Sequence, residues 1–350
     1  MIDSALFAAI AADPVLRQLK LIAEPWDISR YSLGEFQYPW REWNDYYRDA
    51  VRQFWLGDIA RGFGEGVSAL ASSISGSSNI FYFRGPTSSI NFITAHDGFT
   101  MNDLVNYHEK NNLANGEDNR DGANTNRSWN VGIEGPTQDQ KINQIRQSLQ
   151  KSMMATLLLS SGVPMVTMGD EVGRTQHGSN NAFTLPIDLN QNNWNQESAW
   201  FGGWTLDWNP TGDKKDLQDA FTELIRIRKT YLSDITSEFF TGRVDFGTER
   251  KDIAWFSLSG NEMNDEHWSD GDKRSLTVFF EAGPKNGLVL LLNSFGEETT
   301  FTLPGVAWGE GMRCIFDSFE TTATYNPALA APGDKVQVSP HSLQVWLVNR

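Results

Sequence analysis

The sequence predicts an α/β fold followed by an all-β domain. In the first 240 residues, apolar runs of strand length alternate with segments of helical periodicity, which favours a parallel sheet or barrel. Three of these runs end on polar residues, and this favours the barrel, because active sites gather at the carboxyl ends of barrel strands. From about residue 240 the strands become short and the turns frequent, as in a β-sandwich. We therefore expect domains at residues 1–240 and 241–350.

Three predicted strands of the first domain deliver polar side chains at their ends. Each is a short apolar run without helical spacing, as expected for a strand that is buried on both faces. The runs, with the residues that follow them, are Lys20 to Glu24 with Pro25, Ile90 to Ala95 with His96-Asp97-Gly98, and Val163 to Met168 with Gly169-Asp170-Glu171.

Helices are predicted before and between these strands. Apolar residues three or four apart mark one face of each later helix: Tyr47, Val51, Phe54 and Trp55; Ile142, Ile145, Leu149 and Met153, running to Leu159; and Leu217, Phe221, Leu224 and Ile225. The polar segment Asn111 to Asn130 is predicted to be a long loop, and loops of that length are usually functional or mobile.

Six short strands are predicted in the second domain. They are Ile253 to Leu258, Leu276 to Glu281, Leu288 to Leu292, Thr299 to Leu303, Met312 to Phe316 and Leu343 to Val348.

Composition narrows the class of partner. The chain has 350 residues, a net charge of −15 and no cluster of Lys and Arg, so it would repel nucleic acids and anionic membranes. Aromatic residues make up 12% of the chain, with 13 Trp, and exposed aromatic rings are common platforms for sugars. Composition therefore favours a neutral, hydroxyl-rich ligand.

A cytoplasmic location is expected. Cys314 is the only cysteine, which excludes disulfides within the chain and cysteine-based zinc sites. The apolar run Ala5 to Ala12 lacks a preceding positive residue and is closed by Asp13-Pro14, so it fits a helix better than a signal peptide. No stretch approaches the ~18 apolar residues of a membrane span.

Glu24 and Asp97 are the candidate catalytic carboxylates. Glycoside hydrolysis needs a protonated acid beside the leaving oxygen and a second carboxylate nearby, and both residues end predicted strands of one α/β domain. Each also has a purely structural alternative. Glu24 would pair with a Lys or Arg at the strand end, and Asp97 would form a turn or cap the helix predicted near Asn102.

Other ligand motifs fail on inspection. Gly62, Gly64 and Gly66 follow no strand, which argues against a nucleotide loop. The loop from Glu117 imitates the start of a calcium loop, but Ser128 stands where the bidentate Glu is needed. The remaining histidines lack metal-ligand spacing. We therefore expect no metal or organic cofactor.

Five segments of the first domain resemble isoamylase-type glycogen debranching enzymes of the α-amylase superfamily. The similarity continues into the second domain over Ile253 to Trp268, a pattern not shared by amylases in general, so it covers nearly the whole chain. The five segments are Leu21 to Asp27, Glu42 to Asp49, Phe92 to Phe99, Asn115 to Gly122 and Gly169 to Gln176.

The resemblance implies a (β/α)8 TIM barrel whose C-terminal half is this chain, followed by the β-sandwich. Glu24 would end the fifth barrel strand as general acid/base, and Asp97 would end the seventh as the carboxylate that stabilises the transition state. Adjacent His96 would bind the sugar in the −1 subsite. Trp26, Arg174 and Asn181 would line the glucan cleft.

The chain departs from the family pattern in two places. The family's nucleophile is an aspartate at the end of the fourth strand, and neither Asp3 nor Asp13, the aspartates before Glu24, ends an apolar strand. On this interpretation the first four strands are absent, and the chain is expected to fold poorly alone or to need that half as a separate partner. The second departure, from Asn180 to Asp207, concerns the outer subsites and branch-length preference.

The expected function is hydrolysis of α-1,6 branch linkages in glycogen-like glucans, with retention, by the complete enzyme. The expected partner is a branched α-glucan, and this chain alone is expected to be inactive. Two alternatives stay open: a non-catalytic remnant that binds glucan, and another specificity of the α-amylase superfamily.

Overall fold

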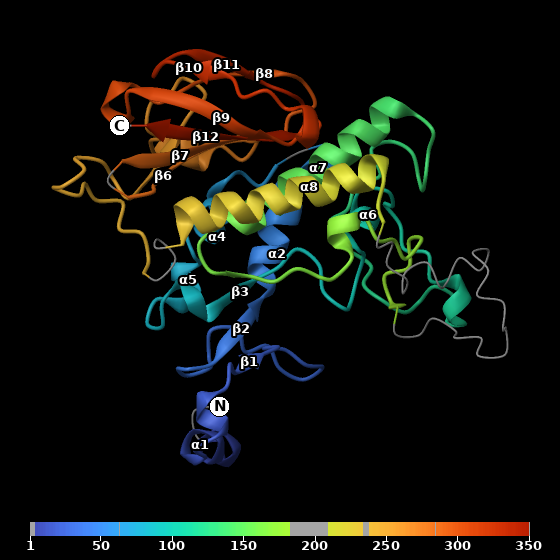
Figure 1. Cartoon of the computed structure of the whole chain (residues 1–350). Helices are drawn as coiled ribbons and strands as arrows, with labels where there is room; N and C mark the ends of the chain where they lie inside the picture. The colour runs from blue at the N-terminus through green and yellow to red at the C-terminus, as the bar shows by residue number, and fades with distance from the viewer. Residues whose placement is uncertain (1–3, 63, 183–208, 234–237, 284, 350) are drawn as a thin grey trace.

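The computed structural model of the chain describes residues 4–62, 64–182, 209–233, 238–283 and 285–349. A parallel sheet with surrounding helices forms the N-terminal part, and the C-terminal strands form a layered β-structure packed against the two longest helices (Figure 1). Among the described residues, no helix is long and apolar enough to cross a membrane.

The parallel sheet has four strands in the order β1-β2-β3-β4. Their bounds are β1 (Ile22–Ala23), β2 (Arg41–Asn44), β3 (Ser89–Asn91) and β4 (Val163–Pro164). The three predicted strands are confirmed but are shorter than expected, because backbone hydrogen bonding between neighbours ends where each chain turns into its loop. As expected for parallel strands, the carboxyl ends meet at one edge.

Strand β2 was not predicted, because its buried side chains are polar. Glu42 is fully buried and forms an ion pair with Arg84, and it also accepts a hydrogen bond from the Gly34 N–H at 2.6 Å. Asn44 donates to Ser77 Oγ at 3.0 Å and Ser89 Oγ at 2.8 Å, and it accepts from Tyr47 N at the start of the next helix. Paired polar groups therefore replace the apolar pattern that marks a buried strand.

Helices cover the sheet and connect it to the C-terminal part. The predicted helix over residues 5–12 is confirmed as α1, and α7 begins at an Asp139 side chain that accepts from two backbone N–H groups. The α-helices of this part are α1 (Ala5–Ala12), α2 (Asp45–Arg52), α3 (Asp58–Arg61), α4 (Ser68–Ile74), α5 (Ser78–Phe81), α6 (Met101–Leu104), α7 (Gln140–Leu159) and α8 (Gly212–Ile227). Short helical turns are η1 (Leu16–Gln18), η2 (Gln53–Gly57), η3 (Pro86–Ser88), η4 (Leu113–Asn115), η5 (Asp170–Val172) and η7 (Arg228–Leu232).

A six-stranded antiparallel sheet and a two-stranded sheet form the C-terminal sandwich, as predicted. The larger sheet has the order β10-β9-β12-β7-β6-β5 and the smaller pairs β11 with β8. The strands are β5 (Ile253–Phe256), β6 (Ser275–Glu281), β7 (Asn286–Asn293), β8 (Thr299–Thr302), β9 (Gly311–Asp317), β10 (Leu329–Ala330), β11 (Lys335–Val338) and β12 (Ser342–Asn349). The helical turns here are α9 (Asp265–Ser269), η8 (Val306–Trp308) and η9 (Thr322–Thr324).

Both faces of the six-stranded sheet are buried. One face, which includes Leu290 and Val345, shares a core with α7 and α8. The other face, which includes Val289 and Trp346, packs against the β8–β11 sheet. This arrangement explains why β6, β7 and β12 read as nearly continuous apolar runs rather than alternating ones. The division at residue 240 stays a prediction.

Candidate active site

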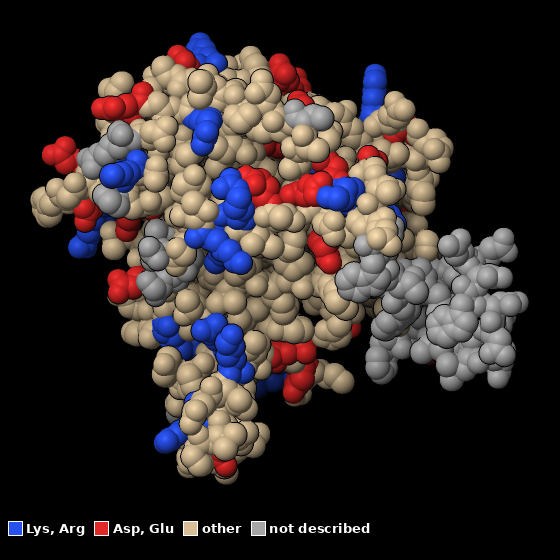
Figure 2. All heavy atoms as spheres, in the orientation of Figure 1, with Lys and Arg blue, Asp and Glu red and all other residues tan. Residues whose placement is uncertain are grey.

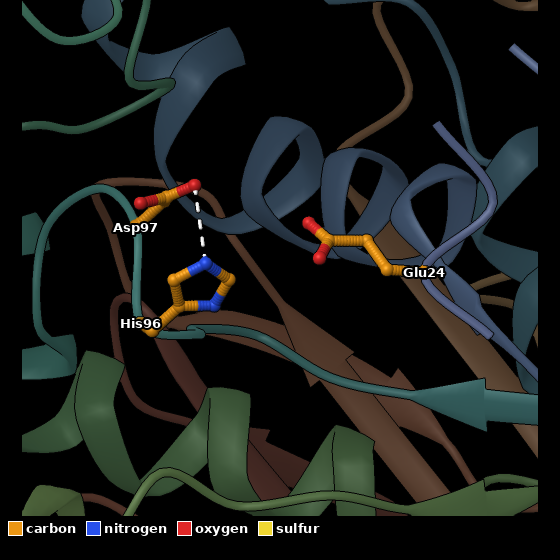
Figure 3. Close-up of side chains that lie close together, drawn as sticks. All are labelled: Glu24, His96 and Asp97. Atoms are coloured by element: carbon orange, nitrogen blue, oxygen red, sulfur yellow. Dashed lines mark ion pairs between the residues drawn. The ribbon is translucent and has the colours of Figure 1, made fainter. Parts of the chain in front are cut away.

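Glu24, His96 and Asp97 converge at the carboxyl ends of the parallel strands. Glu24 follows β1, and His96 and Asp97 lie in the loop after β3, on the other side of β2. One oxygen or nitrogen atom of each side chain lies within 4.8 Å of the other two. Figure 3 shows Glu24 pointing toward the pair from the opposite side of the site, with His96 Nε2 at 3.4 Å from Asp97 Oδ2. The structure thus brings together the two predicted catalytic carboxylates and the predicted sugar-binding histidine.

Two of the structural alternatives are not seen among the described residues, namely the Lys or Arg partner of Glu24 and the helix cap by Asp97, whereas Asp97 does lie in a bend with Gly98. No hydrogen bond or ion pair holds the exposed Glu24 carboxylate to another described residue. The cap of α6 is Thr100, whose side chain accepts from Asp103 N at 3.1 Å, and not Asp97. Both carboxylates therefore remain available to a ligand.

The backbone after Glu24 is held by a local turn. Pro25 is buried, and Trp26 forms an antiparallel bridge with Tyr31. Between Trp26 and Tyr31, Asp27 Oδ1 accepts hydrogen bonds from the N–H groups of Ser29 at 2.7 Å and Arg30 at 2.8 Å. This turn fixes the half-buried Trp26 beside Glu24 at the cavity, and its predicted role in a glucan cleft stays a prediction.

The loop that carries His96 and Asp97 is fixed on both sides. Gly98 has φ +84°, a conformation that L side chains rarely adopt, and its N–H donates to Asn180 O at 3.0 Å. The His96 ring lies 5.7 Å from the ring of Trp43 on β2, which in turn lies 5.7 Å from Phe92. Aromatic contacts and a backbone hydrogen bond therefore orient an otherwise exposed pair.

A cavity of about 130 Å³ contains the three converging side chains. Its remaining walls come from β2, α2 and three loops: Trp26, Trp43, Arg48, Asp49, Arg52, Phe92, Ala95, Gly98, Ala123, Thr125, Asn126 and Arg127. Asp49 is the third carboxylate of this wall, and it accepts from Arg48 Nε at 2.8 Å and pairs with Arg127 Nη1 at 2.9 Å. The two arginines thus neutralise it.

Arg52 forms the buried base of this wall. Burial, together with repulsion from Arg48, lowers the pKa of its guanidinium to about 9. Its Nε donates to Ile93 O at 2.8 Å and its Nη1 to Asn126 O at 3.3 Å. These bonds tie α2 to the segment that leads into His96.

Two buried carboxylates that were not predicted as site residues hold segments next to this loop. Asp170 accepts from Thr94 Oγ1 and from Met101 N at 3.2 Å, and Asp103 accepts from Thr175 Oγ1 and from Gln176 N at 2.6 Å. Burial raises the pKa of each to about 6. The sequence placed Asp170 at a strand end, but no pattern distinguishes a supporting aspartate from a catalytic one.

Arg174 and Asn181 do not line this cavity. Arg174 Nη1 donates to Gln176 Oε1 at 3.0 Å, and Asn181 Nδ2 donates to Asp121 Oδ2 at 2.9 Å. Both lie in the segment packed on the Asn-rich loop, and their place in a glucan cleft stays a prediction. The predicted departure in branch-length preference falls mostly on residues 183–208, outside the described residues.

The long predicted loop is ordered by its asparagines. Asn112 Nδ2 donates to Asn180 Oδ1 at 2.7 Å, and Asn180 Nδ2 donates to Ala123 O at 2.7 Å and Asn126 Oδ1 at 2.8 Å. Lys110 Nζ donates to Asp121 O and Asn124 Oδ1, both at 2.8 Å. These bonds explain the richness in Asn and hold residues 123–127 against the cavity.

Within the described part of the chain, Glu24, His96 and Asp97 are also the one group of His, Cys and carboxylate ligands close enough to share a metal ion. All three are exposed, and exposed groups of this kind are common without an ion. Both acidic and basic side chains lie on the face shown in Figure 2, where the basic ones form small groups near acidic ones.

Comparison with known proteins identifies the C-terminal domain. Residues 252–349 match the family described as isoamylase, C-terminal. The chain is 40% identical over 318 residues to a glycogen operon protein GlgX homolog of Mycobacterium tuberculosis, covering 86% of this chain and 42% of that protein. It is 39% identical over 308 residues to a glycogen debranching enzyme of Yersinia pestis, covering 87% of this chain and 42% of the relative. The chain thus spans less than half the length of these relatives.

Solved structures of similar fold include, by title, pullulanases and a glycogen-degrading virulence factor. A catalytic module of the glycogen-degrading pneumococcal virulence factor SpuA matches with a TM-score of 0.61 and 15% identity, over all of this chain and 50% of that one. Pullulanase type I from Bacillus subtilis complexed with maltose gives a TM-score of 0.58 and 18% identity, over all of this chain and 42% of that one. At such identities the likeness shows the fold. The domain match and the sequence relatives show that this chain belongs to the isoamylase type of the α-amylase family.

Proposed function

We propose that this chain contributes the general acid/base and the transition-state-stabilising carboxylate to the hydrolysis of α-1,6 branch linkages in glycogen-like glucans. The observation that carries the proposal is the convergence of Glu24 and Asp97, from separate strands, to within 4.8 Å beside His96. Branched α-glucan is the proposed substrate, in keeping with the printed names of the relatives.

The proposed reaction proceeds with retention. Glu24 protonates the leaving glycosidic oxygen and later activates water, as one residue does in both steps of a retaining mechanism. Asp97 offsets the positive charge that develops at the anomeric carbon, and His96 donates a hydrogen bond to the bound sugar. Trp26 lines the cleft at the Glu24 side, and Arg174 and Asn181 extend it. No cofactor is required for these steps.

The attacking carboxylate is proposed to come from outside these 350 residues. Asp49 is the only further carboxylate among the described lining residues, and the hydrogen bond from Arg48 and the ion pair with Arg127 reduce its nucleophilicity. The chain by itself is therefore inactive under this mechanism. Activity would need a partner segment that supplies an aspartate near Glu24 and Asp97.

The same proposal treats residues 1–240 as the C-terminal half of a (β/α)8 barrel and residues 241–350 as the sandwich domain. Strands β1 and β4 each pair with one neighbour among the described strands, so one edge of each is open. Ile22 in β1 is 48% exposed and Met168 after β4 is 68% exposed. Further parallel strands would cover both edges. A cytoplasmic location completes the proposal.

The test is an assay of reducing-end release from a branched glucan. The purified chain is incubated alone, and together with a polypeptide that corresponds to the remaining half of a relative. We expect no release by the chain alone and measurable release by the pair, because the pair completes the catalytic carboxylates.

Glu24→Gln should abolish this restored activity, whereas Glu109→Gln, an exposed glutamate outside the cavity, should leave it unchanged. Debranching by the chain alone would overturn the assignment of the nucleophile to another segment. Binding of glucan without hydrolysis in both mixtures would favour the alternative of a non-catalytic remnant.

A further inference from the structure

A second cavity lies in the C-terminal sandwich. It has a volume of about 650 Å³ and opens between β10 at the edge of the six-stranded sheet and β11 of the two-stranded sheet. In Figure 1, β10 and β11 lie at the top of the molecule and β1 lies near the opposite end. Small-molecule sites typically enclose about 300–1,000 Å³, so the volume suits an oligomeric ligand of moderate size.

The floor of this cavity is buried and combines apolar side chains with one amide. Cys314 on β9 and Trp346 on β12 are paired in register, and Gln344 lies on the same face of β12. Gln344 Nε2 donates to Asp317 Oδ2 at 2.8 Å and to Gln337 O at 3.1 Å, and its Oε1 accepts from Trp346 Nε1 at 3.1 Å. The floor is therefore ordered before any ligand enters, which lowers the entropic cost of binding.

The rim combines a ring, an apolar side chain and hydrogen-bonding groups. Tyr325 is half-buried, and its O–H donates to Cys314 O at 3.3 Å, which fixes the ring. Leu329 is 80% exposed. Asn326, Lys335 and Gln337 are exposed lining residues and supply donors to the opening. Such a rim offers both an apolar surface and polar contacts.

The charge of the cavity restricts the class of ligand. Three carboxylates, Asp317, Glu320 and Asp334, face one ammonium group, Lys335, so an anion would be repelled. A bare cation would need a lining of hydrogen-bond acceptors only. Here amide and ammonium donors lie among the carboxylates, which argues against a cation. A hydroxyl group both donates and accepts, and therefore matches a lining of mixed donors and acceptors.

We propose that this cavity is a second α-glucan-binding site, which holds a linear segment of the same polymer whose branch points the site at Glu24 acts on. This inference rests on the proposed function for the identity of the glucan. The glucan hydroxyls would meet the carboxylates and amides, and an apolar sugar face would meet Tyr325. Binding here would retain the polymer without taking part in bond cleavage.

The test is calorimetric titration of the full chain with maltoheptaose. Ala328 is an exposed lining residue, so Ala328→Trp fills the opening without removing a polar contact. Ala323→Trp is the matched control, because Ala323 is exposed on η9 and does not line the cavity. We expect Ala328→Trp to weaken the sandwich-site affinity by about tenfold or more, a loss typical for an occluded contact, and Ala323→Trp to leave it unchanged.

Tyr325→Ala provides a second variant that removes the ring instead of blocking the opening. Both Ala328→Trp and Tyr325→Ala should also shorten retention on immobilised glycogen, including in the Glu24→Gln background. If maltoheptaose binds and neither variant changes its affinity, the sandwich site is wrong while the proposed function stands. If the unaltered chain takes up no maltoheptaose at millimolar concentration, the sandwich site is also wrong, and the debranching assay decides the proposed function independently.

Discussion

At the scale of single residues, the candidate site depends on side chains that do not face it. Asp170 accepts hydrogen bonds from Thr94 and Met101, which lie before and after His96 and Asp97 in the chain. Asp103 accepts from Thr175 and Gln176 in the loop after η5. Sequence patterns predicted the residues that converge on the cavity, because a polar residue directly after an apolar run can be recognised from the sequence alone. The supporting aspartates escaped prediction, since their partners are up to 76 residues away.

Asp170→Asn tests this support through its pH dependence. Because burial raises the pKa of Asp170 to about 6, the folded chain binds its proton more readily than the unfolded chain, whose aspartates titrate near 3.9. The contribution of Asp170 to stability is therefore largest below about pH 4 and is lost as the pH rises through 6.

We expect the free energy of unfolding of the unaltered chain to fall, relative to that of Asp170→Asn, by of order 2 kcal/mol between pH 4.5 and 7.5. Urea denaturation at the two pH values measures this difference, with Asp118→Asn, an exposed aspartate, as the control. Parallel pH profiles for Asp170→Asn and the unaltered chain would show that the group titrates normally.

At the scale of elements, β2 shows where sequence patterns fail. The strands β1 and β3 coincide with apolar runs, but β2 buries Glu42 and Asn44, whose partners Arg84, Ser77 and Ser89 are 33 to 45 residues away. The spacing of apolar residues could not reveal a strand whose buried side chains are polar and form hydrogen bonds and an ion pair with residues far away in the sequence. The short strands β10 and β11 were missed for a different reason: β10 has only two residues, and β11 shows the polar–apolar alternation of a half-buried strand over only four residues.

Glu42→Gln should strongly destabilise the chain. It leaves Arg84, whose side chain is 9% exposed, without its buried counter-charge, and loss of one partner of a buried ion pair typically costs about 3–5 kcal/mol. Chemical denaturation measures the loss. Glu35→Gln is the control, because the Glu35–Arg30 pair is largely exposed and such pairs contribute about 0–1 kcal/mol. Equal losses for the two variants would contradict the structural role of the buried pair.

At the scale of the whole molecule, the sandwich and the α/β part share one core. Lys151 on α7 pairs with Asp216 on α8 and donates to Glu320 O at 2.9 Å, while Asp216 Oδ1 accepts from Thr322 N at 2.7 Å. Ser148 Oγ donates to His341 O at 2.8 Å. The short strands and frequent turns after about residue 240 correctly predicted the sandwich. No local pattern in the sequence predicted that α7 would connect the sandwich to the α/β part.

His341 makes this junction sensitive to acid. Its ring lies 5.1 Å from that of Trp129, and burial lowers the pKa of the imidazole to about 4. In the unfolded chain the imidazole of His341 binds a proton near pH 6.5, whereas in the folded chain it binds one only near pH 4. The free energy of unfolding therefore falls as the pH drops from about 6.5 to about 4.

His341→Asn removes the titrating ring but tolerates the left-handed backbone at this position, where φ is 50°. Between pH 7.5 and 4.5, the unaltered chain should lose of order 2 kcal/mol more than His341→Asn, as measured by urea denaturation. His108→Asn, at an exposed position in the loop after α6, is the control and should behave as the unaltered chain does. An equal acid loss in His341→Asn would assign the effect to other groups.

The brevity of β1 has a consequence for when the site is assembled. Its two residues connect Glu24 to the sheet through β2 alone, whereas His96 and Asp97 follow a strand that has neighbours on both sides. Local opening of β1 would carry the acid away from its partners while the rest of the sheet stays folded, so the amides of this segment should exchange with deuterium well before those of β3. The proportion of molecules in which Glu24 lies beside Asp97 is then set by the free energy of this one local opening. A partner strand that docks beside Ile22 would raise that free energy and therefore that proportion.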